Sequence, residues 1–259
     1  MKTTLPLLVL LITSAGCALA PGPVAATAPD MRVYELRTYT ATPGNLGKVL
    51  ARFRDHTVRL FAKHDIVNVG YWVPTDKKDG AGEKLVYLLA HASREAATAS
   101  WAAFRADPEW VAAKAASESS GPIVAKTESV FLAATDYSPA LARTRGGATR
   151  SFELRTYTVP EGKLAALDAR FRDHTKALFV QHGMTNVAYF HPLDANQGAG
   201  QTLIYFLAAP SREAATSAWN AFRADPVWIA VKADSEKRDQ LLPKTQSVYL
   251  TPTDFSPMQ

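Results

Sequence analysis

The chain carries the same sequence module twice, 118 residues apart, with no insertion or deletion between the copies. Residues from about 33 to 139 recur from about 152 to 257. Three pairs of identical stretches set the register: Glu35–Thr40 with Glu153–Thr158, Arg52–Thr57 with Arg170–Thr175, and Ser93–Thr98 with Ser211–Thr216. A unit repeated in register is one foldable module used twice, and related modules usually pack about a pseudo-twofold axis. We therefore expect two similar halves.

The repeat also predicts the domain organisation. We expect a first domain over residues 31–137, a linker over 138–150 and a second domain over 151–257. Each copy has about 105 residues, which is enough for a modest hydrophobic core of its own. The formal charge of +5 is small for 259 residues, and the Lys and Arg residues are scattered. A nucleic-acid partner is therefore not indicated.

Residues 1–17 have the features of an export signal. Lys2 supplies a positive charge, residues 5–12 are apolar, and residues 13–16 are small. The apolar stretch is too short to span a bilayer as a helix. The signal ends at Cys17, the only cysteine, in a run Ser14–Cys17 that resembles the lipobox of bacterial lipoproteins. The alternatives are ordinary cleavage after Ala20, which the following Pro21 disfavours, and an incidental cysteine in a discarded peptide.

Lipidation of Cys17 would hold the mature protein on a membrane. Ala18 follows the cysteine, and by resemblance to the lipoprotein sorting rule this favours the outer membrane of a Gram-negative cell, facing the periplasm. Residues 18–30 are rich in Pro, Ala and Gly without periodicity, which indicates a flexible tether. The rest of the chain has no cysteine, so the domains can form no disulfide.

The residue pattern of each copy predicts the element order β-α-β-β-α-β, which is the ferredoxin-like unit of the α+β class. In the first copy we expect strands at 32–40, 68–73, 84–90 and 127–133, helices at 45–64 and 93–105, and a short helix after Asp107-Pro108. Asn45, Ser93 and Asp107 are the expected helix caps. A four-stranded sheet with helices on one face leaves its other face bare. Two such sheets can bury these faces against each other as a barrel within one monomer.

These residues resemble the NIPSNAP family of the dimeric α/β-barrel superfamily. The resemblance rests on four stretches of the first copy: Tyr34–Tyr39, Phe61–His64, Val86–Leu89 and Trp101–Trp110. It implies an intramolecular version of the dimeric barrel. The family's biochemical role is undefined, and related barrels include haem-degrading and antibiotic-biosynthesis monooxygenases, so the fold alone does not imply a reaction.

Two histidines in each copy are candidate ligand-binding residues. His64 and His182 end the first helices and face the sheet, where each could bind a ligand or transfer a proton. The alternative is a cation near the helix C-terminus, and Gly183 there is typical of a C-cap. His56 and His174 lie two turns earlier, about 12 Å away along the axis, so both histidines of a copy cannot bind one metal. No metal site is predicted, and haem is retained as a less favoured cofactor.

A charged row follows the first strand of each copy on one face. Its candidate binding residues are Arg37, Tyr39, Arg155 and Tyr157, beside Glu35 and Glu153. The row is either a set of ion pairs across the interface between the copies or a site at which arginine recognises a carboxylate or another anion.

Aromatic residues complete the candidate set. Tyr87, Tyr205, Trp101 and Trp219 are either core residues or the lining of a cavity for an apolar or planar ligand. His91 and His191 have no counterpart in the other copy, and we expect them on the surface.

The sequence thus predicts an exported NIPSNAP-like protein that binds a small, partly apolar ligand or a partner. The first alternative is a cofactor-independent enzyme of the oxygenase or isomerase type that uses His64, His182 or the Arg37 and Tyr39 pair. The second is a haem-binding protein. Further assembly of the monomer stays open.

Overall fold

The computed structural model describes residue 1 and residues 30–141, 144 and 148–259. The predicted signal, Cys17 and nearly all of the tether therefore lie outside the described residues, as does part of the linker. Among the described helices, none combines the length and the apolar character needed to cross a membrane.

Both copies have the predicted element order. The first copy consists of β1 (Val33–Ala41), α1 (Leu46–Arg52), η1 (Phe53–Thr57), α2 (Val58–Lys63), β2 (Val67–Pro74), η2 (Lys77–Asp79), β3 (Lys84–His91), α3 (Arg94–Ala106), α4 (Pro108–Ser117) and β4 (Val124–Ala134). The second consists of β5 (Ser151–Thr158), α5 (Leu164–Arg170), η3 (Phe171–Thr175), α6 (Lys176–Gln181), β6 (Thr185–Pro192), η4 (Ala195–Gln197), β7 (Thr202–Ala209), α7 (Arg212–Ala224), α8 (Pro226–Asp239) and β8 (Lys244–Pro252).

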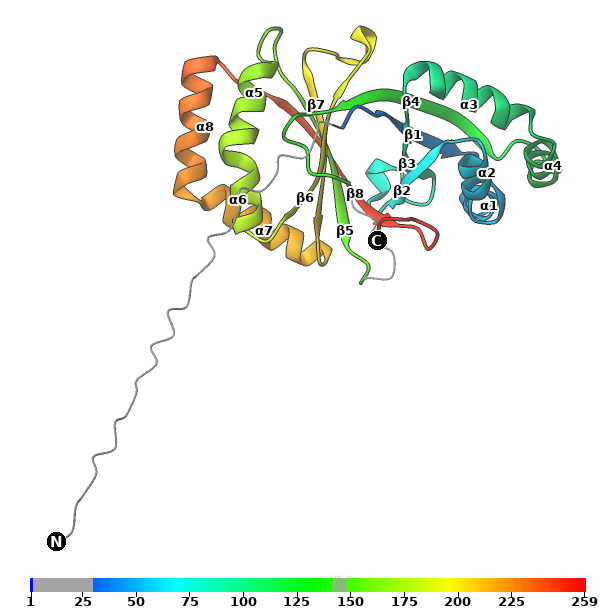
Figure 1. Ribbon diagram of the computed structural model, residues 1–259, viewed down its shortest axis with the longest axis horizontal. Helices are drawn as coiled ribbons and strands as arrows, with labels where there is room; N and C mark the ends of the chain where they lie inside the picture. Colours follow the sequence, from blue (N-terminus) through cyan, green and yellow to red (C-terminus); the bar gives the residue numbers. More distant parts are fainter. Residues whose placement is uncertain (2–29, 142–143, 145–147) are drawn as a thin grey trace.

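The eight strands form one closed barrel in the order β1-β3-β2-β8-β5-β7-β6-β4. Each copy contributes four adjacent antiparallel strands, and the barrel closes where β2 pairs with β8 and β4 pairs with β6. In Figure 1 the helices of the two copies lie at opposite ends of the molecule, with the strands between them. The predicted intramolecular barrel is therefore confirmed.

Strand alternation separates two kinds of core. Tyr34 and Leu36 point into the barrel, where they join a cluster with Trp72, Phe152 and Phe190 from both copies. The intervening residues of β1 point outward to the helices and form the face of a second core with α1–α4. An equivalent core lies under α5–α8 in the second copy. Closure of the barrel leaves no free edge, which is the usual weakness of an open sheet.

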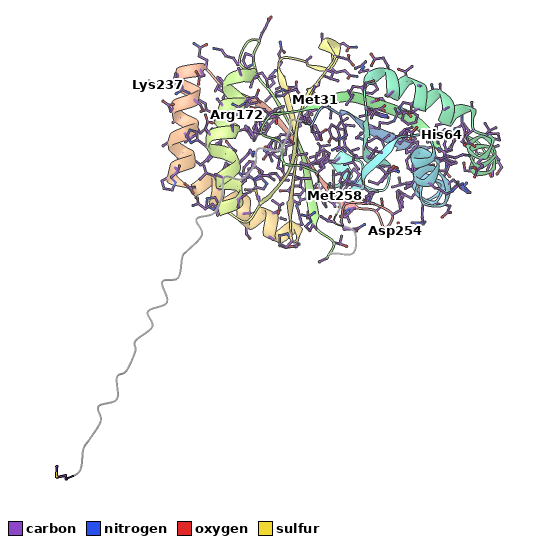
Figure 2. The ribbon with its side chains drawn as sticks, viewed as in Figure 1. Met31, His64, Arg172, Lys237, Asp254 and Met258 are labelled. Carbon is purple, nitrogen blue, oxygen red and sulfur yellow. The ribbon has the colours of Figure 1, made fainter. Side chains whose placement is uncertain are left out.

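The two copies also exchange the segments that follow their last strands. Phe255, after β8, packs into the helical core of the first copy, and Tyr137, after β4, packs into that of the second. Arg54 pairs with Asp254 at 2.8 Å, and Arg172 pairs with Asp136 at 2.7 Å in the same manner. Figure 2 labels one residue of each pair, Asp254 and Arg172. Contacts that reach across in both directions are what a pseudo-twofold axis produces.

The first helix of each copy contains a feature that the sequence did not predict. The segments Phe53–Thr57 and Phe171–Thr175 form single π-turns within an otherwise α-helical run. In the first, the hydroxyl of Thr57 donates to the carbonyl of Arg52 at 3.1 Å, five residues back. Such turns insert one extra residue and shift the faces of the helix on either side.

The predicted caps of the later helices are present, and that of the first is not. Ser93 accepts from the N–H of Ala96 at 3.1 Å, and Asp107 accepts from that of Glu109 at 2.8 Å. Asn45 makes no such bond, because its amide donates to the hydroxyl of Thr42 at 2.9 Å.

Candidate functional site

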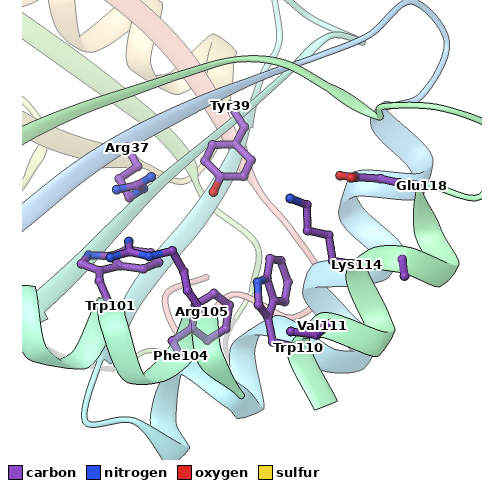
Figure 3. Close-up of a pocket in the computed structure, with 10 residues that line it drawn as sticks. Arg37, Tyr39, Trp101, Phe104, Arg105, Trp110, Val111, Lys114 and Glu118 are labelled. Carbon is purple, nitrogen blue, oxygen red and sulfur yellow. The ribbon is translucent and has the colours of Figure 1, made fainter. Parts of the chain in front are cut away.

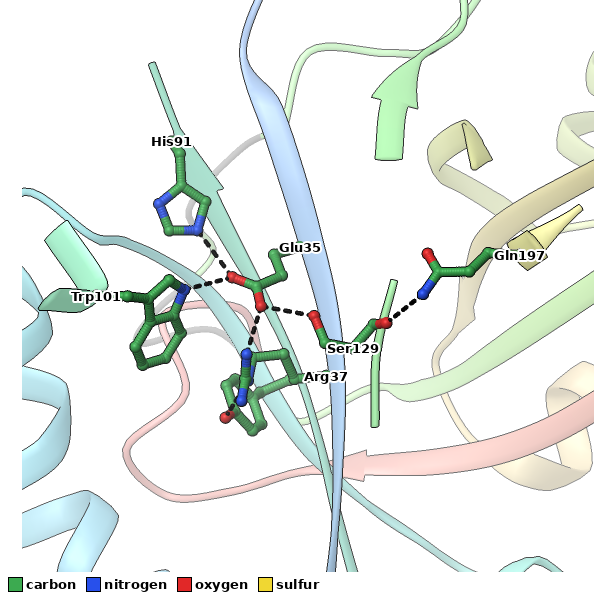
Figure 4. Close-up of polar contacts among 7 residues, drawn as sticks. Glu35, Arg37, His91, Trp101, Ser129 and Gln197 are labelled. Atoms are coloured by element: carbon green, nitrogen blue, oxygen red, sulfur yellow. Dashed lines mark hydrogen bonds and ion pairs between the residues drawn. The ribbon is translucent and has the colours of Figure 1, made fainter. Parts of the chain in front are cut away.

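The candidate site of the first copy is built around a buried carboxylate. Glu35 is only 1% exposed, between β1 and α3. It accepts hydrogen bonds from His91 Nε2 at 3.1 Å, Trp101 Nε1 at 2.8 Å and Ser129 Oγ at 2.6 Å, and it forms an ion pair with Arg37 (Figure 4). Burial alone would raise the pKa of Glu35, but these donors and the charge of Arg37 hold it at about 2. The carboxylate is therefore ionised and fully engaged.

Arg37 is fixed on three sides by this arrangement. One nitrogen pairs with Glu35, Nε donates to the Tyr87 hydroxyl at 2.8 Å, and the guanidinium carbon lies 4.5 Å from the centroid of the Trp101 ring. Burial alone would lower the pKa of Arg37, but Tyr87, Tyr39 and Glu35 raise it. Arg37 is thus a permanent cation, stacked on an indole ring at a fixed position.

One of the two predicted arrangements of the charged row, ion pairs across the interface between the copies, is wrong. The ion pair joins Glu35 to Arg37 within one strand of one copy, and Glu153 pairs with Arg155 at 2.5 Å in the second. It does not cross the interface between the copies, because the odd-numbered residues of β1 face the helices while the even-numbered residues face the barrel interior.

A cavity of about 590 Å³ opens beside Arg37, between β1, α3 and α4 (Figure 3). Its lining contains four aromatic residues, three cations, one carboxylate and two small or aliphatic residues: Tyr39, Trp101, Phe104, Trp110, Arg37, Arg105, Lys114, Glu118, Val111 and Ala115. The carboxylate of Glu118 pairs with Arg52 at 2.8 Å. The cavity therefore offers aromatic surfaces and an excess of positive charge.

Of the ten lining residues only Arg37, Tyr39 and Trp101 were predicted as site residues, and three of the seven others are charged. Arg105, Lys114 and Glu118 lie on exposed or partly exposed helix positions, where a charge is ordinary. All ten lining positions recur in the second copy, and the only change of residue type replaces Val111 with Ile229. This repetition of surface charges between the two copies was the available signal.

The second copy repeats the carboxylate cluster with two differences. Glu153 accepts from Trp219 Nε1 at 2.5 Å and from the hydroxyl of Ser247, but Ala209 stands where the first copy has His91. Arg155 stacks on Trp219 at 4.2 Å and donates from Nε to the Tyr205 hydroxyl at 2.9 Å, as Arg37 does to Tyr87.

The other difference concerns the hydrogen bonds of the terminal guanidinium nitrogens of Arg155 and Arg37. Arg155 Nη2 donates to the Tyr157 hydroxyl at 3.1 Å. No corresponding bond joins Arg37 to Tyr39 within the described part of the chain, although the two side chains adjoin. The first copy thus leaves one guanidinium edge free for a ligand, whereas the second uses it internally.

The helix-end histidines bind carboxylates of their own copy. His64 Nε2 lies 2.7 Å from Asp107 Oδ2, and His182 Nε2 lies 2.7 Å from Asp225 Oδ2. Both aspartates cap the helix that follows, so each histidine links two helices. Neither histidine lines the cavity beside Arg37.

The remaining histidines are spread over different environments. His56 and His174 are exposed on the π-turns. His91 is 1% exposed, so its predicted surface position was wrong, whereas His191 is partly exposed and hydrogen-bonded to Asp168 at 3.0 Å. His91 follows Tyr87 and Leu89 on the same face of β3, and continued alternation would have placed it in the core.

The geometry favours binding of an organic anion over ligation of a metal or haem. The cavity lining contains no histidine, and the described residues include no group of three or more His, Cys, Asp or Glu side chains that could hold a metal ion. Nε2 of His64 and of His182 already bonds a carboxylate. What the site supplies is a fixed guanidinium, flexible cations at its rim and aromatic rings.

Solved structures of other proteins share this fold over most of the chain. A 1.55 Å structure of a Lactobacillus acidophilus protein, provisionally described as a monooxygenase, is 10% identical, covers 88% of this chain and 98% of its own, and has a TM-score of 0.54. An anthrone oxidase-like protein is 16% identical, with coverage of 91% and 97% and a TM-score of 0.56. A NIPSNAP domain protein from Burkholderia xenovorans is 22% identical, with coverage of 42% and 99% and a TM-score of 0.36. Among curated proteins no sequence matches.

The family comparison is decisive because it covers both copies. The NIPSNAP family model matches residues 34–139 and again residues 152–257, which together make up most of the chain. The chain therefore belongs to the NIPSNAP family, with two domains in tandem.

Proposed function

We propose that this protein binds a planar, partly apolar organic anion in the cavity beside Arg37. The observation that carries the proposal is the guanidinium of Arg37, stacked on Trp101 and held in the wall of a cavity of about 590 Å³. Cavities of this size suit a small organic molecule. A fixed guanidinium can bind a carboxylate or phenolate without losing much conformational freedom.

The other walls support the same class of ligand. Tyr39, Phe104 and Trp110 offer ring surfaces on which a planar molecule can stack, and Lys114 and Arg105 add positive charge at the rim. Glu118 is neutralised by Arg52, so it opposes an anion less than a free carboxylate would. An apolar body with one anionic group satisfies all of these surfaces.

A direct test uses 2-naphthoate as a probe and follows tryptophan fluorescence, since Trp101 and Trp110 line the cavity. We expect saturable quenching by 2-naphthoate and much weaker quenching by uncharged 2-naphthalenemethanol. Arg105→Gln with Lys114→Gln should weaken binding about tenfold, which corresponds to about 1.4 kcal/mol. Both side chains are exposed, so the fold should survive.

The matched control is Arg223→Gln with Lys232→Gln, the same change in the second copy. It should leave the affinity for 2-naphthoate nearly unchanged, because Arg155 there donates to Tyr157. Equal binding of the charged and uncharged probes, or equal loss in the two double variants, would refute the proposal for this cavity.

We also propose export and lipid anchoring through Cys17. The support is the charged and apolar pattern of residues 1–17 and the lipobox-like run that ends them. Labelling of cells with radioactive palmitate should mark the wild-type protein and not the variant Cys17→Ala. Export without label in the wild type would favour ordinary cleavage after Ala20.

The second candidate function is an oxygenase-like or isomerase-like enzyme acting in the same cavity. Its support is the fold shared with the anthrone oxidase-like protein and with the protein provisionally described as a monooxygenase, together with Arg37 and Tyr39 at the cavity wall. Arg37 could stabilise the enolate or phenolate formed when a substrate loses a proton. Oxygen uptake with 1,8-dihydroxyanthrone as the probe should then fall with Arg37→Gln. No uptake by the wild type would remove this reaction while leaving the binding proposal intact.

A further inference from the structure

Two arginines at equivalent positions are buried between helices, but only one of them meets a carboxylate. Arg52 and Arg170 end α1 and α5, and both stack on a tryptophan, Trp110 at 5.3 Å and Trp228 at 5.4 Å. Arg52 pairs with Glu118 at 2.8 Å. Arg170 is 5% exposed, donates from Nη1 to Ser235 Oγ at 3.1 Å, and forms no ion pair with any described residue.

The difference comes from the length of the last helix. α4 ends at Ser117, so Glu118 is its C-cap and can reach back to Arg52. α8 continues to Asp239, which keeps the equivalent Glu236 on the helix. There Glu236 lies 3.7 Å from Lys232, one turn earlier, in place of an ion pair with the arginine.

Arg170 lines a second cavity of about 340 Å³, between α5, η3 and α8. These helices pack against each other at one end of the molecule (Figure 1). The lining combines apolar positions with polar and charged ones: Ala169, Ala230, Val231, Arg170, Asp173, His174, Asp234, Ser235 and Arg238. Nε of Arg170 is buried without a hydrogen-bond partner, as is Nε of Arg52, so the two arginines differ in the carboxylate partner and not at this atom.

A buried cation without a carboxylate is costly, because burial removes water without supplying an opposite charge. Burial lowers the pKa of Arg170, and nearby groups, including Glu236 and Tyr157, offset this only in part. Even so, a guanidinium stays protonated at neutral pH. Arg170 can therefore bind an oxyanion in the position that the carboxylate of Glu118 occupies beside Arg52.

We infer that this second cavity binds a small organic monocarboxylate on Arg170. Ser235 and the free guanidinium edge would hold the carboxylate, while Ala169, Ala230 and Val231 would contact a short apolar chain. The volume is near the lower limit for small-molecule sites, which excludes a large ligand. This inference concerns a different cavity from the one beside Arg37 and does not depend on the proposed function.

The charged residues at the rim of the second cavity favour a ligand with a single negative charge. Arg238 is paired with Asp234 and Asp239, each at 2.9 Å, so it adds little positive charge to the site. Asp173 also lines the cavity and would oppose a dianion. A monocarboxylate should therefore bind better than inorganic phosphate, which is partly a dianion at neutral pH.

The test is a nitrogen-15 NMR titration of the arginine Nε–H signals with butyrate, acetate and inorganic phosphate as separate probes. We expect the Arg170 signal, assigned by its loss in Arg170→Met, to shift saturably with butyrate and less with acetate. The Arg52 signal should not move. Phosphate stronger than butyrate, or no saturable shift at Arg170, would overturn the inference.

A converse variant guards against an effect of Arg170→Met on folding. Glu118→Gln removes the carboxylate from Arg52 and should make the Arg52 signal respond to butyrate, while Arg170 still responds. If Arg52 stays silent in this variant, an uncompensated arginine is not what creates the site. The 2-naphthoate experiment reports on the other cavity, so the two proposals can fail separately.

Discussion

His91 lies 3.1 Å from the carboxylate of Glu35, and each of the two side chains is 1% exposed. The second copy has no such pair, because Ala209 occupies the position of His91. His91 is one of four groups that stabilise the ionised carboxylate of Glu35, and through it the position of Arg37. His91 thus gives the first copy one hydrogen bond to this carboxylate that the second copy lacks.

Acid should destabilise the protein through Glu35. Its pKa is about 2 in the folded state against an ordinary 4.5, so its stabilising contribution is present above pH 4.5 and is lost as the pH falls towards 2. The loss should reach roughly 3 kcal/mol in the free energy of unfolding. Urea unfolding of wild type and Glu35→Gln at several pH values measures it. The variant should be less stable at pH 6 and show a flatter dependence, and parallel curves would contradict the assignment to Glu35.

Alkali should leave the central tyrosines protonated. Burial raises the pKa of Tyr71, Tyr87, Tyr189 and Tyr205 well above 10. At about pH 11.5 these four of the nine tyrosines should add no phenolate absorbance until urea unfolds the chain. Unfolded tyrosines ionise near pH 10, so the free energy of unfolding should also decline as the pH rises past that value. A full phenolate signal with an intact circular dichroism spectrum would show that the rings are not sealed from solvent.

The barrel interior should not tolerate a methyl group at Gly70. A Cβ there would overlap the indole ring of Trp72, two residues later on the same face of β2. Gly70→Ala should therefore cost about 1–3 kcal/mol in the free energy of unfolding. The second copy has Ala188 and Phe190 at the equivalent positions, both fully buried. The double variant Gly70→Ala with Trp72→Phe copies that pair and should recover part of the loss in urea unfolding. An undiminished loss would mean that the two sites are packed differently.

One helix end carries strain that its counterpart avoids. Asp65 has φ of 58° after α2, whereas Gly183 has φ of 83° after α6. Glycine adopts such angles without the steric cost of a side chain. Asp65→Gly should raise the free energy of unfolding by up to about 1 kcal/mol, and Gly183→Ala should lower it by about 1 kcal/mol. Thermal unfolding of both variants checks the pair, and a change of the same sign in each would contradict this reading.

The repeat and the alternation of residues predicted the architecture, because both act on the whole chain. Each copy must bury one bare sheet face, and the other copy is always present to cover it. The same alternation placed Glu35, Arg37 and Tyr39 together on one face. It could not say whether that face meets the helices or the other sheet, since both layers are apolar.

The details of the site depend on shifts of one residue, which periodicity does not resolve. The π-turn at Phe53–Thr57 shifts the faces of α1 and α2 relative to each other, and no propensity predicts it. The end of α4 at Ser117, against the longer α8, gives Arg52 a carboxylate partner, whereas Arg170 forms no ion pair with any residue that the structure describes. The position at which a helix ends depends on packing, and local sequence signals are weakest there.

Closure of the barrel within one chain makes assembly independent of protein concentration. Two separate chains that share a barrel come apart on dilution, whereas here the strands of β2 and β8, and of β4 and β6, meet at a fixed effective concentration. The shared core therefore persists at any expression level. Because each half is encoded separately, a substitution changes one site and leaves the other alone, a freedom that identical subunits lack.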